Sequence, residues 1–206
     1  MNVHSFIFVL SMRTRDTDKE GLVRRKAIEM IVKEGLDGFS MQKLAKAANI
    51  SPATLYIYYK DREDLLISVS LTVVDEMLAI SLQDFHPELS FAEGMRLQWR
   101  NRLEYFRRYP VEMQFMEQVR YSPMYEKVHE TVSHKFGDVL GPFVHRAIAN
   151  GELKPVPFEV YWSVAFAPLY QLIKFHSQGS HKDRNFKITE EIMLTTLEMV
   201  LKGLKP

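Results

Sequence analysis

The segment at residues 51–66, SPATLYIYYKDREDLL, concentrates hydroxyl and aromatic side chains on what its spacing predicts to be a short helix. Ser51 followed by Pro52 is typical of a helix N-terminus, because the serine oxygen caps free amides and proline needs no amide partner there. At about 100° per residue, Leu55 and Tyr59 share one face of this helix. The opposite face consists of Ala53, Thr54, Ile57 and Tyr58, with Tyr56 at its flank.

This outer face offers hydrogen bonds and methyl contacts. Thr54 and Tyr58 can hydrogen-bond to base edges or phosphates, and Ala53 and Ile57 can contact the methyl groups of thymine. Lys60, at the end of the helix, adds a positive charge for the phosphate backbone. The pattern predicts a helix that lies in the major groove of DNA. The alternative is that these side chains belong to a packed core, which we expect only for the two residues of the inner face.

Such a helix needs neighbours that hold it in place, and the preceding sequence predicts them. An apolar stripe of helical period covers residues 18–34, and Gly35 follows where a C-terminal cap belongs. Ser40 predicts the start of a second helix, and Asn49 suits a left-handed turn position before Ser51 starts the third. Two short helices joined by a tight turn form a helix-turn-helix.

Residues 38–66, GFSMQKLAKAANISPATLYIYYKDREDLL, resemble the DNA-binding domain of the TetR/AcrR family of bacterial transcriptional regulators. The matching features are Ser40, the pair Leu44 and Ala45, the run from Thr54 to Tyr56, Tyr59, and the charged run that leads into Leu65 and Leu66. Asn49 stands where members of the family often have glycine. The resemblance covers about residues 22–66, and the rest of the chain matches only in style.

Together with the outer face described above, the resemblance implies a DNA interface made of Ser40, Met41, Gln42, Ser51, Ala53, Thr54, Tyr56, Ile57, Tyr58 and Lys60. The family binds DNA as two-fold dimers. This agrees with geometry, because one short helix reads few base pairs, whereas a dimer presents two recognition helices about 34–36 Å apart. We therefore expect a homodimer on a roughly palindromic, double-stranded operator, acting as a repressor.

The distribution of charge and the absence of cysteine limit the possible functions further. Residues 13–60 contain ten Lys and Arg against six Asp and Glu, a net charge of +4, whereas the whole chain carries only +1. A basic N-terminal part is what an anion-binding domain needs. The absence of cysteine excludes disulfides and thiolate chemistry, and we expect a cytoplasmic protein without a membrane anchor. We interpret residues 1–11 as an extension, with an apolar arm that docks on a partner as the alternative.

The rest of the chain predicts an all-α fold of about nine helices, with a helix-turn-helix domain at residues 13–64 and a helical effector-binding and dimerisation domain at residues 65–206. Asp61 with Asp64, and Ser90 with Glu93, are spaced as helix caps. Proline at positions 142 and 168 lies inside predicted helices and should kink both of them.

Two further sets of residues are predicted in the C-terminal domain. As a set, aromatic and Met residues favour a small, largely apolar effector, although for any one of them a place in the core is the favoured interpretation: Trp99, Phe106, Met113, Met116, Tyr121, Tyr125, Phe143, Trp162, Phe166 and Tyr170. Apolar stripes on the last two predicted helices, at residues 158–177 and 189–204, suggest a four-helix dimer interface: Val160, Val164, Ala167, Ile192, Thr196 and Met199.

Charged residues of this domain leave alternatives open. Arg96, Arg100 and Arg102 can bind a carboxylate or simply be solvated. His129 and His134 are five residues apart, one too many for a zinc-binding pair on one helical face, so we interpret them as surface residues. Neither a phosphate-binding glycine loop nor a nucleophile motif occurs. We therefore expect no catalytic residues, no metal and no cofactor, and hence no enzyme.

These inferences combine into a two-state switch, in which an effector favours a conformation whose recognition helices no longer fit the operator. One alternative is a DNA-binding regulator without a small-molecule ligand, which a filled C-terminal domain would favour. The other is a helical enzyme or binding module that retains a vestigial helix-turn-helix, which predicts no salt-dependent DNA binding.

Overall fold

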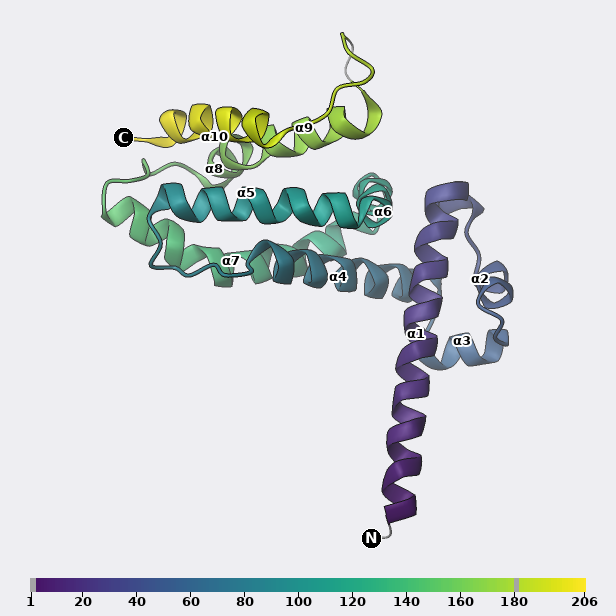
Figure 1. Cartoon of the computed structure of the whole chain (residues 1–206). Helices are drawn as coiled ribbons and strands as arrows, with labels where there is room; N and C mark the ends of the chain where they lie inside the picture. Colours follow the sequence, from purple (N-terminus) through teal and green to yellow (C-terminus); the bar gives the residue numbers. More distant parts are fainter. Residues whose placement is uncertain (1–2, 180–181) are drawn as a thin grey trace. The chain divides into compact units, whose positions relative to one another are not determined.

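The computed structural model describes residues 3–179 and 182–206, with side chains described from Lys19 onward. The prediction about an apolar arm at residues 1–11 therefore lies outside the described side chains. Ten helices and no strand occur in the described ranges, which confirms the predicted all-α fold (Figure 1). Each helix in these ranges is too short or too polar to span a bilayer.

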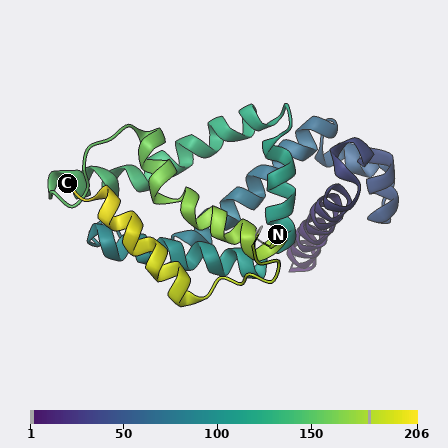
Figure 2. The ribbon, with the colours of Figure 1, turned by 90° about the horizontal axis from the view of Figure 1, so that it is seen from above.

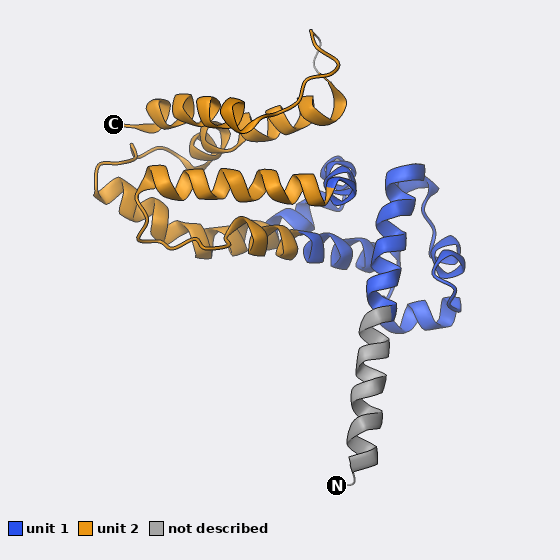
Figure 3. Cartoon of the chain, in the orientation of Figure 1, with its two compact units in different colours: residues 1–73, 110–130 blue, residues 74–109, 131–206 orange. Residues whose placement is uncertain are grey.

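The chain forms two compact units (Figure 3). Residues 1–73 and 110–130 form one, here called the head unit, and residues 74–109 and 131–206 form the other, the body unit. The predicted boundary after residue 64 stays a prediction, because compactness groups residues 65–73 and 110–130 with the helix-turn-helix. Two long helices, α4 (Arg62–Ser81) and α7 (Tyr125–Ala149), belong in part to each unit.

In the head unit, helices α1 (Val3–Gly38), α2 (Met41–Ala47) and α3 (Pro52–Tyr58) follow the predicted order, and α2 packs on both α1 and α3 (Figure 1). The helical conformation of α1 is interrupted by a kink at Gly35, the residue predicted to end it, whose φ of 77° and ψ of 169° suit glycine, and the helix then continues to Gly38. Asn49 has a φ of 54°, which confirms the left-handed turn between α2 and α3.

Helix α4 begins with a reciprocal cap. The Asp61 Oδ1 atom accepts a hydrogen bond from the Asp64 amide at 2.9 Å, and Asp64 Oδ2 accepts one from the Lys60 amide at 2.9 Å. Both predicted cap residues are therefore confirmed, and they fix the chain where α3 turns into α4. Helix α6 (Pro110–Arg120) packs against α1 and buries Phe115 completely.

The body unit contains α5 (Phe91–Arg108), α8 (Phe158–Ala165), α9 (Ala167–Gln178) and α10 (Glu190–Leu204), and α10 packs against the other three (Figure 2). The predicted capping box of Ser90 and Glu93 is present at the start of α5. Helix α7 includes Pro142 and continues past it as one helix.

Pro168 divides one predicted helix into two. Its missing N–H leaves no helical partner for the carbonyl four residues before it, and the chain breaks at Phe166, whose φ is −127°. The neighbouring Ala165 carbonyl accepts a 2.8 Å hydrogen bond from the indole N–H of Trp99. One predicted helix with a kink is thus two helices, α8 and α9, which makes ten instead of nine.

Close packing in the body unit depends on a glycine in α5. A Cβ atom at Gly94 would lie 2.5 Å from the Phe143 ring and 3.3 Å from the Phe85 ring. Phe143 is itself buried and contacts both Phe85 and Phe91 edge-on or stacked. Only a residue without a side chain lets α5 approach this ring so closely.

We therefore expect Gly94→Ala to lower the free energy of unfolding by about 1–3 kcal/mol, because the new methyl group overpacks the contact with Phe143. Gly137→Ala in α7 is the matched control, since no atom lies within 4 Å of its added Cβ, and it should raise stability by about 0.5–1 kcal/mol. Denaturant titration followed by circular dichroism measures both. Equal stability of the Gly94 variant and the parent would contradict this packing.

Candidate nucleic-acid interface

Helix α3 begins as the sequence predicts. The Ser51 Oγ atom accepts a 3.0 Å hydrogen bond from the Thr54 amide, and Pro52 occupies the first helical turn. Leu55 is fully buried and Tyr59, at the C-cap, is 4% exposed, so the predicted inner face is confirmed. These two residues anchor a helix of only seven residues against the rest of the head unit.

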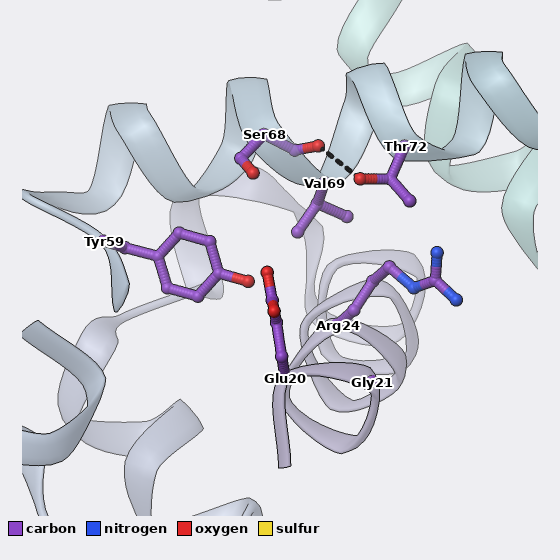
Figure 4. A pocket seen from close by; sticks show the side chains of 7 residues that line it. All are labelled: Glu20, Gly21, Arg24, Tyr59, Ser68, Val69 and Thr72. Atoms are coloured by element: carbon purple, nitrogen blue, oxygen red, sulfur yellow. Dashed lines mark hydrogen bonds between the residues drawn. The ribbon is translucent and has the colours of Figure 1, made fainter. Parts of the chain in front are cut away.

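The Tyr59 phenol lies at the edge of a half-open pocket of about 290 Å³ between α1, the end of α3, and α4 (Figure 4). Its hydroxyl points toward the carboxylate of Glu20. Burial, followed by the nearby charge of Glu20, raises the pKa of Tyr59 to about 12. The phenol is therefore neutral at physiological pH and behaves as a core side chain, as predicted.

The outer face of α3 is exposed, but unevenly. Ile57 is 79% exposed and Tyr56 is 53% exposed, and Ala53 and Lys60 are exposed as well. Exposed apolar side chains of this size on a charged surface indicate a binding face. Tyr56, expected at the flank, is thus one of the accessible side chains of α3.

Two of the residues predicted to contact bases, Thr54 and Tyr58, are less exposed than expected. Thr54 is half-buried, and its hydroxyl forms a 2.8 Å hydrogen bond with the Ser51 hydroxyl, so it completes the helix cap. Tyr58 is half-buried, too. The prediction that either hydroxyl contacts DNA stays untested, and the apolar residues Tyr56 and Ile57 present the larger accessible surface.

The start of α2 contains the other predicted contacts. The Ser40 Oγ atom accepts a hydrogen bond from the Lys43 amide at 3.2 Å, and Gln42 is exposed. Met41 is the first residue of α2, as predicted, and its side chain is 6% exposed and packs into the core. Only its main-chain amide remains available to a phosphate.

Two basic residues of the head unit, Lys43 and Arg62, have structural roles. Lys43 forms an ion pair with Glu34 at 2.9 Å and donates to the Gly38 carbonyl at 2.8 Å. Arg62 donates to the Leu36 carbonyl and lies over the Phe39 ring at 5.8 Å, so it fastens the loop between α1 and α2. Sequence reasoning missed this role, because the partners are 26 positions apart and no periodic pattern links them.

The residues predicted to line an effector pocket are not brought together in one unit. Met113, Met116, Tyr121 and Tyr125 belong to the head unit, and the other six belong to the body unit. Tyr121 is 79% exposed, so its assignment to an interior pocket is wrong; it follows the end of α6, where the chain turns at the surface. Trp99, Phe143 and Phe166 are almost fully buried core residues.

Two hollows in the described chain are lined by other residues. One is the pocket beside Tyr59, and the second, of about 270 Å³, lies in the body unit among Phe91, Ala92, Gly151, Glu152, Leu201 and Lys205. None of the predicted pocket residues lines either hollow. His129 and His134 are exposed, as their interpretation as surface residues predicts.

The predicted dimer stripe lies on α8, α9 and α10 of the body unit, and much of it is accessible. Val160 is 46% exposed, Met199 is 68% exposed, and Ala167 is exposed as well. The remaining residues, Val164, Ile192 and Thr196, are half-buried. Since α8 and α10 pack against each other, both sides of the stripe belong to the same unit.

Residues 19–69 match the family of bacterial regulatory proteins named tetR. An uncharacterized HTH-type transcriptional regulator of Haemophilus influenzae is 25% identical over 187 residues, which are 91% of this chain and 96% of that protein. A TetR family transcription regulator from Marinobacter aquaeolei VT8 superposes with a TM-score of 0.82 at 28% identity, covering 94% of this chain and 98% of that one.

A further solved structure shares the fold at lower identity. The transcriptional regulator FadR from Bacillus subtilis, in complex with stearoyl-CoA, superposes with a TM-score of 0.73 at 18% identity. The superposition covers 89% of this chain and 98% of FadR.

The turn that presents α3 can be tested through Asn49. We expect Asn49→Ala to lower the free energy of unfolding by about 1–2 kcal/mol, because alanine is strained at a φ of 54°, whereas Asn49→Gly should change it by less than about 0.5 kcal/mol. Lys46→Ala, at an exposed position in α2, controls for loss of a polar side chain. If alanine and glycine at position 49 gave equal stability in urea titrations, the turn would not depend on this conformation.

Proposed function

Because the chain belongs to the TetR family of bacterial transcriptional regulators and binds DNA through its helix-turn-helix, we propose that it is a homodimeric repressor of a roughly palindromic operator. It acts in the cytoplasm and leaves the operator when a small, largely apolar effector binds. The observation that carries the proposal is the exposure of Ile57 and Tyr56 on a helix whose other face is anchored in the head unit.

The outer face of α3 suits the major groove. Ile57 and Ala53 offer methyl contacts for thymine, and Tyr56 offers both a flat apolar ring and a hydroxyl donor. Lys60, which follows α3, and Lys46, in the last turn of α2, are exposed and supply charge for phosphates. The helix-turn-helix geometry, in which the second helix of the motif enters the groove, assigns the reading role to α3.

Dimerisation supplies a second recognition helix, which binds the second half-site of the operator. A seven-residue helix contacts few base pairs, so affinity and specificity require a second copy about 34–36 Å away. The accessible stripe of Val160, Ala167 and Met199 is the surface that a second copy would cover. Its pairing with the same stripe of the partner gives a two-fold, four-helix interface.

An effector in the body unit can act on the head unit through the helices that the two units share. Helix α7 is joined to α4 by an ion pair of Lys127 with Glu63 in the head unit and by one of Lys135 with Asp75 in the body unit. A shift of either helix therefore reaches the other. A coupling of about 1–3 kcal/mol, or five- to 150-fold in operator affinity, is an ordinary size for such a switch.

The apolar character of the proposed effector rests on the aromatic interior of the body unit. FadR, a protein of the same fold, binds stearoyl-CoA, which contains a long acyl chain. The competing hypothesis is a regulator without a small-molecule ligand. The tight burial of Trp99, Phe143 and Phe166, each at most 1% exposed, is the observation that favours it.

The proposed DNA contacts make separable predictions for Lys60 and Ile57. Lys60→Ala should weaken binding to all sequences and reduce the slope of log affinity against log salt by about one, since one phosphate contact is lost. Ile57→Ala should weaken operator binding by about tenfold without changing the slope, because methyl contacts release no counterions. Fluorescence anisotropy with operator DNA, selected from the parent genome, measures both.

Val111→Ala is the control for Ile57→Ala, because it shortens an exposed apolar side chain on α6. It should bind operator DNA like the parent. An unchanged salt slope after removal of Lys60, together with full affinity after removal of Ile57, would exclude this face of α3 from the interface.

The dimer interface is tested by placing a charge in the stripe. Met199→Glu should convert the dimer to a monomer, because two-fold symmetry brings two carboxylates into one apolar contact. Val139→Glu is the matched control, since Val139 is also an exposed apolar residue of the body unit but lies outside the stripe. Sedimentation velocity distinguishes the two forms. A Met199 variant that remains dimeric would place the interface elsewhere.

A further inference from the structure

One charged side chain in the body unit is buried without a counter-charge. Arg102 lies in the middle of α5 and is only 2% exposed, whereas Arg96 and Arg100 on the same helix are exposed, and Arg100 pairs with Glu190 at 3.3 Å. The alternative that Arg102 is solvated is therefore wrong, whereas the alternative that it binds a carboxylate stays a prediction.

The hydrogen bonds of Arg102 involve one side of its guanidinium. Nη1 donates to the Gln98 carbonyl at 3.3 Å and to Gln98 Oε1 at 3.1 Å. The described part of the chain offers no hydrogen-bond partner to Nε or Nη2 of Arg102, nor to Nε2 of Gln98. Nε and Nη2 form one edge of the guanidinium, whose two parallel N–H groups match the two oxygens of a carboxylate.

The side chains around the guanidinium are aromatic and uncharged. Its central carbon lies 4.4 Å from the centre of the Phe166 ring and 6.0 Å from that of Phe136. Trp162 contacts both rings, and Tyr170 stacks on Trp162. Burial raises the pKa of Tyr161, so this nearby phenol remains protonated and supplies no negative charge.

An unpaired guanidinium in such a place is unfavourable. Removing an ion from water costs several kcal/mol, and the contact with Phe166 and the Gln98 hydrogen bonds offset only part of this. A bound anion cancels the charge and satisfies the free donors together. An ordered water molecule could accept one hydrogen bond, but it would leave the charge in place.

We propose that Arg102 is the anchor for the effector, and that the effector is an organic acid with one carboxylate and an extended apolar body. The carboxylate binds the Nε and Nη2 edge of Arg102, with Gln98 Nε2 as a third donor, and the apolar body packs against Phe136, Trp162 and Phe166. This inference rests on the proposed function, because it names the ligand class of that switch.

The charge of the site selects a carboxylate over a phosphate monoester. Arg102 contributes one positive charge, and its two nearest arginines along α5 are exposed. A carboxylate therefore gives a neutral pair, whereas a phosphate dianion would leave an uncompensated negative charge among aromatic rings. The aromatic surroundings in turn require a ligand whose remaining atoms are apolar.

The position of Phe166 connects this site to the dimer stripe. Phe166 is the residue at which α8 ends and α9 begins, and its ring covers the Arg102 guanidinium. Its chain neighbours Val164 and Ala167 belong to the predicted dimer stripe. A ligand that displaces this ring must therefore move the junction of the two helices at the stripe.

The first test compares acids with matched alcohols on the parent protein. Fluorescence of the two tryptophans, Trp99 and Trp162, is followed during titration with hexadecanoate and 2-naphthoate, and with hexadecan-1-ol and 2-naphthalenemethanol. Each acid that fits the site should bind at least tenfold more tightly than its alcohol. The proposal is overturned if neither acid binds, or if acids and alcohols bind equally.

The second test removes the anchor. Arg102→Met should weaken acid binding by about 10- to 150-fold, the loss expected for charge-assisted hydrogen bonds, and alcohol binding should not change. Arg96→Met, the same substitution at an exposed position of α5, should have no effect. Arg102→Lys keeps the charge but lacks the two-donor edge, and it should bind acids with intermediate affinity. Full acid binding by Arg102→Met would overturn the proposal.

Melting temperatures of the ligand-free proteins distinguish a ligand anchor from a structural residue. Arg102→Met should melt at or above the temperature of the parent, because an apolar side chain replaces a buried, unpaired charge. A clear decrease, with Arg96→Met unchanged, would assign Arg102 to stability and contradict an unpaired charge. If that variant does not fold, the comparison of acids with alcohols still decides the proposal.

Operator binding separates this inference from the proposed function. Parent protein saturated with the tighter acid should bind the operator five- to 150-fold more weakly than free protein. Acid binding that requires Arg102 but leaves operator affinity unchanged would uphold the site and contradict the switch. Operator binding that no acid affects, with no acid bound, would leave the DNA-binding function intact and overturn the site.

Discussion

The burial of Leu55 and Tyr59 determines which side chains of α3 are available to a partner. Seven residues cannot form a stable helix by themselves, so α3 exists only because these two anchors, the Ser51 cap and the left-handed Asn49 hold it. Because the inner face is buried, the side chains on the opposite face of α3 are necessarily the exposed ones. Ile57 and Tyr56 therefore point away from the head unit. Exposure of such side chains to water is unfavourable, and it is typical of a binding surface.

The two units are both helical, but their side chains have different roles. The head unit positions a small outward face, and its polar side chains serve mainly as caps and loop fasteners, as Thr54 and Arg62 do. The body unit has a dense aromatic core, in which Arg102 is a buried charge without a counter-charge among the described residues. Helices α4 and α7 contribute residues to both units, and the ring of Phe136 in α7 lies 6.0 Å from the central carbon of the Arg102 guanidinium.

Local rules explain what the sequence predicts well. Caps at Ser40, Ser51, Asp61 and Ser90 and the turn at Asn49 depend on residues within four positions, and the structure contains all of them. Burial is harder to predict from the sequence, because the helical period assigns a residue to a face of its helix but does not identify what packs on that face. The prediction for Tyr121 failed for this reason, and the roles of Arg62 and Arg102 depend on partners that only the fold brings near.

We propose that two copies of α3 lie in successive major grooves on one side of the duplex. Hydroxyl-radical footprinting of full-length protein on a selected genomic site tests it most directly. The account predicts two protected patches, related by a dyad and centred about one helical turn, 10–10.5 base pairs, apart on one face of the DNA. A single patch without symmetry, or protection that does not depend on Ile57 and Lys60, would contradict it.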